Sequence, residues 1–93
     1  MTEWIFKNSP HLEAKLKKLE KKSPSQFKAA QNKIEEIKRI IPENPQHYKN
    51  LRYDLKDYKR VHIDKSFVII FTVDLTLKKV EFLDLDHHDK IYE

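Results

Sequence analysis

The sequence contains no cysteine and no glycine, and each absence excludes a class of site. Without cysteine there is no disulfide, no thiolate metal ligand and no thiol nucleophile. At average usage, a chain of 93 residues would contain roughly six glycines. The Walker loop and the Rossmann fingerprint both place glycine where the backbone meets a phosphate. The usual nucleotide-cofactor enzymes are therefore excluded.

Long apolar runs are also missing. No stretch approaches the roughly 20 apolar residues that a membrane span needs. The N-terminal segment, Met1 to Lys7, lacks the basic and then apolar order of a signal peptide. We therefore expect a soluble, cytoplasmic protein without membrane contact, folded as one domain over residues 1–93.

Positive charge is concentrated in the first half of the chain. The net charge is +4, and residues 1–50 hold 11 Lys/Arg against 6 Asp/Glu, whereas residues 51–93 hold 8 against 9. A basic half is compatible with a polyanionic or acidic partner. It is equally compatible with the solvated outer faces of helices.

The first half predicts a short strand followed by two helices. Trp4 to Phe6 is the short apolar strand, and Ser9-Pro10 and Ser23-Pro24 have the serine and proline that begin helices. Ser23 and Gln26 also have the spacing of a capping box. Pro42 ends the second helix. Apolar residues recur on one face of each helix, namely Leu12, Leu16 and Leu19 in the first and Phe27, Ala30, Ile34, Ile37 and Ile41 in the second.

The second half changes to the period of strands. Residues 58–63 alternate, with Val61 and Ile63 on one face, and residues 67–73 are nearly all apolar, as in a central strand buried on both faces. A turn over residues 74–78 and a further strand over residues 80–86 follow. The order β-α-α-β-β-β predicts an α+β fold in which a helical hairpin packs on one side of a small, mainly antiparallel sheet.

The tail after the last strand holds candidate chemistry. His87 and His88 titrate near neutral pH, so either can serve as a general acid or base. They can also be exposed tail residues. With Asp89 they offer metal ligands, although they lack the spacing of a zinc motif. Tyr92 can pack the tail onto the domain, stack on a base or transfer a proton.

A second group of candidates precedes and includes the first basic strand. Arg60 and His62 share a strand face with Tyr58, where an arginine fork and an imidazole can bind a phosphodiester. The alternative is an ordinary solvated sheet face. The segment that leads into the sheet carries three basic residues, Lys49, Arg52 and Lys56. These residues can line the same groove, or they can be ordinary surface charge.

Taken together, these features resemble the RelE/ParE superfamily of toxin–antitoxin toxins along the whole chain. The resemblance rests on the helical hairpin, on Leu55 before the basic strand, and on the apolar strand that ends Phe71-Thr72-Val73. Many members of the superfamily finish with His-Arg-x-x-aliphatic-Tyr. The corresponding stretch here is His87-His88-Asp89-Lys90-Ile91-Tyr92.

The RelE branch of this resemblance implies an mRNA interferase, an endoribonuclease that cuts mRNA in the ribosomal A site without a metal or cofactor. The ribose 2′-OH attacks the adjacent phosphate and expels the 5′-oxygen, which requires a base, an acid and nearby cations. At the matching positions, His87 or His88 would transfer protons and Tyr92 would orient or stack the RNA. Arg60 and His62 would stabilise phosphate charge. The residues expected to bind the RNA are Lys49, Arg52, Lys59 and Lys90.

The resemblance also implies partners: a cognate antitoxin, with a heterotetramer as one arrangement, and the ribosome with its mRNA. The chain departs from the family at two arginine positions, where Val68 follows the aromatic of the central strand and His88 stands in the tail. Two alternatives therefore stay open. One is a ParE-like toxin that inhibits DNA gyrase without catalysis, and the other is a degenerate RNA-binding protein of the same fold.

Overall fold

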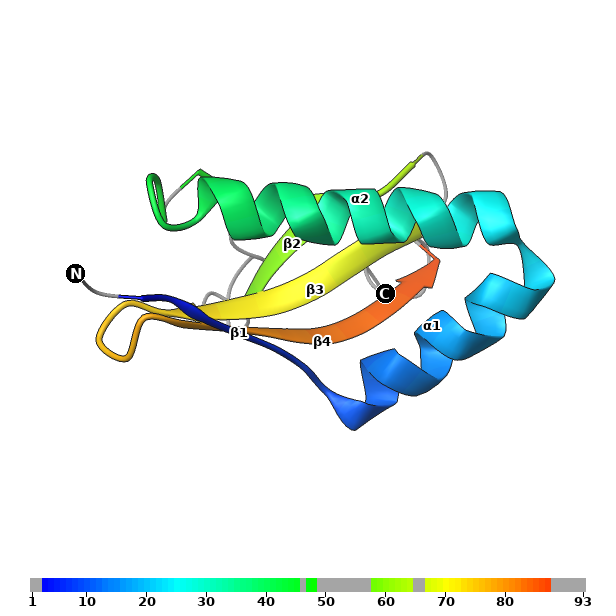
Figure 1. Cartoon of the computed structure of the whole chain (residues 1–93), viewed down its shortest axis with the longest axis horizontal. Helices are drawn as coiled ribbons and strands as arrows, with labels where there is room; N and C mark the ends of the chain where they lie inside the picture. Colours follow the sequence, from blue (N-terminus) through cyan, green and yellow to red (C-terminus); the bar gives the residue numbers. More distant parts are fainter. Residues whose placement is uncertain (1–2, 46, 49–57, 65–66, 88–93) are drawn as a thin grey trace.

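In the part of the chain that the structure describes, two helices pack on a four-stranded sheet (Figure 1). The computed structural model describes residues 3–45, 47–48, 58–64 and 67–87. The elements follow the predicted order, which confirms the α+β fold. They are β1 (Ile5–Asn8), α1 (Pro10–Lys22), α2 (Pro24–Ile40), β2 (Tyr58–His62), β3 (Phe67–Asp74) and β4 (Lys79–His87).

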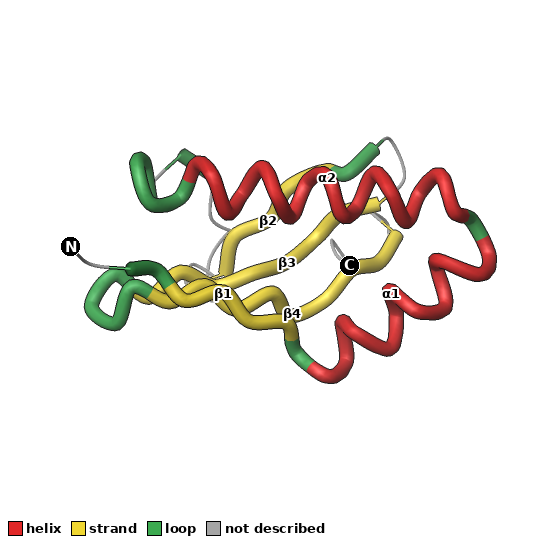
Figure 2. Tube along the Cα trace, in the orientation of Figure 1, coloured by secondary structure: helices red, strands yellow, loops and turns green. Residues whose placement is uncertain are grey.

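The strands lie in the order β1-β4-β3-β2, so β4 and β3 occupy the middle of the sheet (Figure 2). β1 pairs with β4 in parallel, and the other two pairings are antiparallel. The parallel pairing ends where Asn8 meets Phe82, so the second half of β4 has no strand on that side. α1 begins there and runs beside the free part of β4 (Figure 1).

Ser9 begins α1 and fastens it to β4. Its Oγ accepts a hydrogen bond from the backbone N–H of Leu12 (3.0 Å) and donates to the carbonyl of Leu83 (2.7 Å). Its own backbone N–H donates to the carbonyl of Phe82 (2.8 Å). The predicted serine N-cap followed by proline is therefore confirmed, and it also fixes where the helix leaves the sheet.

Ser23 joins the two helices, but the predicted capping box is wrong. Ser23 is both the C-cap of α1 and the N-cap of α2, and its side chain makes no capping hydrogen bond. A capping box needs the backbone N–H of the serine to reach the side chain three residues later, here Gln26. That N–H instead donates to the carbonyl of Leu19 (2.8 Å), because it still belongs to the last turn of α1.

The main core lies between the helices and one face of the sheet, called here the helix face. It buries the leucines predicted for α1 and most of the apolar stripe predicted for α2, and they pack against Phe71 and Phe82 of the central strands. The ring of Phe71 lies between those of Tyr48 and Phe82, with centroid distances of 5.6 Å to Tyr48 and 5.7 Å to Phe82. This contact holds the chain after α2 against the middle of the sheet.

The other face of the sheet, called here the opposite face, carries a smaller apolar cluster. Val68 and Ile70 are buried there, with Tyr58 and Leu83 packed against them. β3 is therefore buried on both faces, as its nearly continuous apolar sequence predicts. Within the described part of the chain, neither helix is long and apolar enough to cross a membrane.

Candidate functional site

Two rows of side chains cross the opposite face where β4 approaches its end. Residues paired directly across strands project on the same side of a sheet, so the strand register identifies the members of each row. Neighbouring strands are about 4.8 Å apart, so each row extends roughly 10 Å from β2 to β4. The first row is His62, Val68 and Asp86, and the second row is Arg60, Ile70 and Asp84.

The β2 end of these rows carries two groups that can bind an anion. The register confirms that Arg60 and His62 share a face with Tyr58; Arg60 is half-buried and His62 is exposed. A guanidinium offers a planar fork of donors that matches phosphate oxygens, and an imidazole N–H can donate a hydrogen bond. This edge of the sheet therefore presents a guanidinium and an imidazole on one face.

Lys59 lies on the same strand, between Tyr58 and Arg60 in the sequence, but it projects to the helix face. Only 6% of it is exposed, and its Nζ donates to the carbonyl of Tyr48 at 3.1 Å. Burial lowers its pKa. The prediction that Lys59 binds RNA is therefore wrong, because its ammonium faces the core and anchors the segment after α2 to β2.

The centre of the first row is apolar. Val68, which stands where the resemblance predicts an arginine, is 0% exposed and packs with Ile70. The charged groups of the two rows therefore lie at their ends, with cations on β2 and the carboxylates of Asp84 and Asp86 on β4. The two kinds of charge are therefore separated by roughly 10 Å, the spacing of two strands.

β4 ends beside the first row. His87 is the last residue of β4 and pairs with Phe67, directly after Asp86 of the first row. The end of β4 is therefore two strands away from β2, which carries His62. The remaining candidates, His88, Lys90, Tyr92, Lys49 and Arg52, lie outside the described residues.

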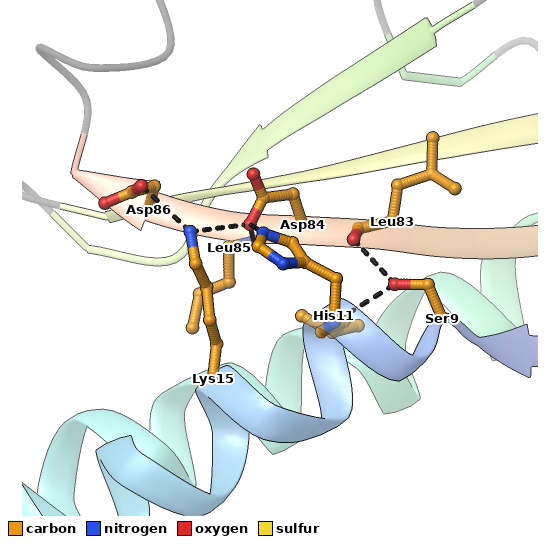
Figure 3. Close-up of polar contacts among 8 residues, drawn as sticks. Ser9, His11, Lys15, Leu83, Asp84, Leu85 and Asp86 are labelled. Atoms are coloured by element: carbon orange, nitrogen blue, oxygen red, sulfur yellow. Dashed lines mark hydrogen bonds and ion pairs between the residues drawn. The ribbon is translucent and has the colours of Figure 1, made fainter.

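A group of charged side chains at the edge of β4 was not predicted from the sequence (Figure 3). Lys15 of α1 places its Nζ 2.8 Å from Asp84 Oδ1 and 2.9 Å from Asp86 Oδ2. His11, one turn earlier, places its Nε2 3.2 Å from the same oxygen of Asp84. One lysine thus joins the two carboxylates that end the rows.

The ammonium of Lys15 is held in its charged form by this arrangement. Burial alone lowers the pKa of Lys15, but the hydrogen bonds to Asp84 and Asp86 raise it above its usual value. All three side chains are between a quarter and a third exposed, at 28%, 34% and 25% for Lys15, Asp84 and Asp86. The sequence signal was the i, i+2 spacing of the two aspartates on β4, which places both on one face.

The described residues contain no group of three or more His, Asp or Glu side chains that could hold a metal ion. The acidic pair at the edge of β4 is joined by a lysine, and a cation that close opposes metal binding.

The fold is that of known toxins. The structure of a YoeB/ParE toxin from Agrobacterium tumefaciens has a TM-score of 0.70 and 11% identity, covering 90% of this chain and 98% of that one. The toxin–antitoxin complex RelBE2 from Mycobacterium tuberculosis has a TM-score of 0.67 and 19% identity, with 95% and 94% covered.

Sequence comparison is more specific than the fold. A relative from Methanocaldococcus jannaschii, named "Putative toxin RelE4", is 55% identical over 84 residues, which cover 90% of this chain and 85% of the relative. The family model described as "ParE toxin of type II toxin-antitoxin system, parDE" matches residues 7–92. By these two matches, the chain belongs to the RelE/ParE superfamily of type II toxin–antitoxin toxins.

Proposed function

We propose that this protein is a metal-independent endoribonuclease that cleaves mRNA in the ribosomal A site in the cytoplasm. In this reaction the O2′–P bond forms as the P–O5′ bond breaks. The products are a 2′,3′-cyclic phosphate and a 5′-hydroxyl end. The proton of the 2′-OH passes to a base, and an acid supplies a proton to the leaving O5′. Cations are needed where negative charge develops on the phosphate.

The proposed roles follow the chemistry of each side chain. His87 or His88 transfers protons, and Tyr92 orients or stacks the bases at the scissile bond. Arg60 and His62 bind the phosphate that becomes more negative in the transition state. The residues proposed to bind the RNA backbone are Lys49, Arg52 and Lys90.

One observation carries this proposal: Asp86, the residue before the end of β4, is in the same row as His62. Asp86, Val68 and His62 align across three strands, and His87 follows immediately. A tail that starts there begins roughly 10 Å from His62, which is about the spacing of two strands. That distance suits one phosphate and its neighbouring ribose. The proposal requires a proton-transferring group of the tail to reach this phosphodiester from the end of β4.

The proposal includes an antitoxin partner that keeps the toxin inactive. The solved neighbour from M. tuberculosis is a toxin–antitoxin complex, which supports a partner of this kind. An amphipathic helix or added strand from the antitoxin would cover basic surface near the site. A heterotetramer of two toxins and two antitoxins is the proposed assembly.

The test is primer extension on mRNA translated in a cell-free extract, with and without the purified protein. New 5′ ends within the coding region are expected at ribosome-occupied codons. The double substitution His87→Ala with His88→Ala should lower the cleavage rate by roughly two decades or more. The control is His47→Ala, which removes an exposed histidine from the segment after α2. Equal cleavage by the double variant and the control would refute the assignment of the tail histidines.

A second candidate function is inhibition of DNA gyrase without catalysis. The family model that matches residues 7–92 is described as a ParE toxin, and this description favours the alternative. A supercoiling assay run beside the translation assay separates the two functions. Loss of supercoiling without any mRNA cleavage would replace the nuclease proposal. RNA binding without cleavage or gyrase inhibition would leave a degenerate RNA-binding protein.

A further inference from the structure

Lys15 is the link between α1 and the end of β4, where the proposed RNA site begins. Its ammonium lies within 2.9 Å of a carboxylate oxygen of both Asp84 and Asp86 (Figure 3). These two residues end the rows that begin with Arg60 and His62. A change in the charge at the end of β4 therefore changes the electrostatic potential along both rows.

The local charge count shows what Lys15 does. With Lys15 in place, the three side chains carry a net charge of −1 at neutral pH. Without it, two carboxylates on one face of β4 would carry −2, roughly 10 Å from the groups proposed to bind phosphate. RNA phosphates are repelled by carboxylates at this range, because 10 Å is about one Debye length at moderate salt.

We propose that Lys15 is a positioning residue that acts through Asp84 and Asp86: it halves the negative charge at the end of β4 so that RNA can approach Arg60 and His62. This inference rests on the proposed function for its ligand, a single-stranded RNA. It assigns to α1 a part in the site that is independent of the tail. It also explains why a lysine in the middle of a basic helix lies against a strand and not only in solvent.

The predicted effect on binding follows from Coulomb's law. One unit charge about 10 Å from a phosphate, at the effective dielectric near a protein surface, changes RNA affinity roughly 10-fold at low salt. A charge removed from the outer side of the same helix is farther away and screened by solvent, so its effect is smaller. The effect of Lys15 should also shrink as salt is added, because screening acts on the same interaction.

Four variants and one control test the proposal by fluorescence anisotropy with a short, labelled, single-stranded RNA whose riboses are 2′-O-methylated and so resist cleavage. Lys15→Met changes the local charge from −1 to −2 and should weaken binding roughly 10-fold. Lys15→Arg keeps both charge and bridge and should bind like the wild type. Lys15→Met with Asp84→Asn restores −1 without the bridge and should also bind within a factor of about two of wild type. Lys17→Met is the matched control, since it removes the same charge from an exposed position two residues along α1.

The fourth variant, Asp84→Asn alone, keeps the inference testable if Lys15→Met does not fold. It retains Lys15 with Asp86, brings the local charge to zero and should tighten RNA binding severalfold. Circular dichroism and thermal unfolding of every variant report whether the fold is intact. A lower melting temperature alone does not mimic the result, because a purely structural role would not be rescued by Asp84→Asn in the Lys15→Met background.

The outcomes separate this inference from the proposed nuclease function. Equal binding by Lys15→Met and Lys17→Met would overturn it, and so would a double variant that binds as weakly as Lys15→Met. Failure of the wild type to bind the RNA probe would overturn it as well. A wild type that binds the probe but cleaves no translated mRNA would refute the nuclease and leave the role of Lys15 in RNA binding supported, provided the variants behave as predicted.

Discussion

Lys59 and Arg60 are adjacent basic residues on β2, and their placement predicts different effects on RNA binding when each is substituted. Arg60 belongs to the second row on the opposite face, whereas Lys59 is 6% exposed on the helix face. Substitution of either residue by methionine removes one positive charge from the same strand. We expect Arg60→Met to weaken RNA binding and Lys59→Met to leave it unchanged.

The size of the effect can be worked out from this placement. A guanidinium about 4 Å from a phosphate gains roughly 1 to 4 kcal/mol, depending on the effective dielectric. A loss of about 1.4 kcal/mol on substitution of Arg60 corresponds to a 10-fold change in the dissociation constant. Each phosphate neutralised on a single strand also contributes about 0.7 to the slope of log K against log salt. Lys59 should contribute nothing to this slope, because its Nζ is engaged with the Tyr48 carbonyl at 3.1 Å.

The assay is a salt titration of RNA affinity, followed by anisotropy with the same methylated RNA probe. Arg60→Met should lower the slope by about 0.7, whereas Lys59→Met should keep the wild-type slope and instead change the free energy of unfolding in urea. A slope that falls equally in both variants would refute the assignment of the two residues to opposite faces. An unchanged slope for Arg60→Met would remove Arg60 from the proposed phosphate site.

Two further predictions concern stability and pH. Ser9→Ala should lower the free energy of unfolding by about 1–2 kcal/mol, because the Ser9 hydroxyl makes two hydrogen bonds to backbone groups. Ser23→Ala should lower it by less than about 0.5 kcal/mol, because the Ser23 side chain makes no capping hydrogen bond. Equal losses in urea titrations would contradict this difference in capping. Burial alone raises the pKa of Glu36, but hydrogen bonds from Tyr48 and Lys33 lower it below 4.5, so this contribution to stability is present above pH 4.5 and is lost as pH falls through the folded pKa. Tyr48→Phe should therefore flatten the acid loss of stability in urea titrations at stepped pH, and an acid loss as steep as in the wild type would contradict this role of the Glu36 pKa.

The sequence predicted the elements well because their periodicity is local. Leucines three and four residues apart lie on one side of a helix whatever surrounds it, and Leu12, Leu16 and Leu19 are all buried in the main core. The nearly unbroken apolar run of β3 similarly required a strand covered on both faces. These predictions need no knowledge of which element lies beside which.

Two errors came from details that depend on neighbouring residues. The capping box at Ser23 failed because a turn this tight leaves the serine N–H within α1, where it bonds to Leu19. The RNA-binding role of Lys59 failed although the pattern contained the correct signal. Lys59 has the same parity on β2 as Val61 and Ile63, whose side chains pack against the main core. Its charge suggested a surface, and its position in the alternation indicated the helix face.

The contact of Lys15 with Asp84 and Asp86 could not have been predicted from the sequence. The hydrogen bond between Lys15 and Asp86 joins residues 71 positions apart. The first predicted helix contains five lysines, namely Lys15, Lys17, Lys18, Lys21 and Lys22, and local pattern does not distinguish the one that meets β4. Only the parallel pairing of β1, which ends at Asn8, sets α1 beside the second half of β4.

The proposed site also shows why charge counted along the chain does not locate a binding surface. The basic half of the sequence, residues 1–50, contains Lys15, whose charge is shared with carboxylates of the acidic half. Arg60 and His62, which are proposed to stabilise the scissile phosphate, come from the second half, where acidic residues slightly outnumber basic ones. The strand register brings cations and carboxylates into the same two rows, and Lys15 of α1 reduces the negative charge at the carboxylate end. Affinity for RNA should therefore respond more to the substitution of Lys15 than to that of the more exposed lysines around it.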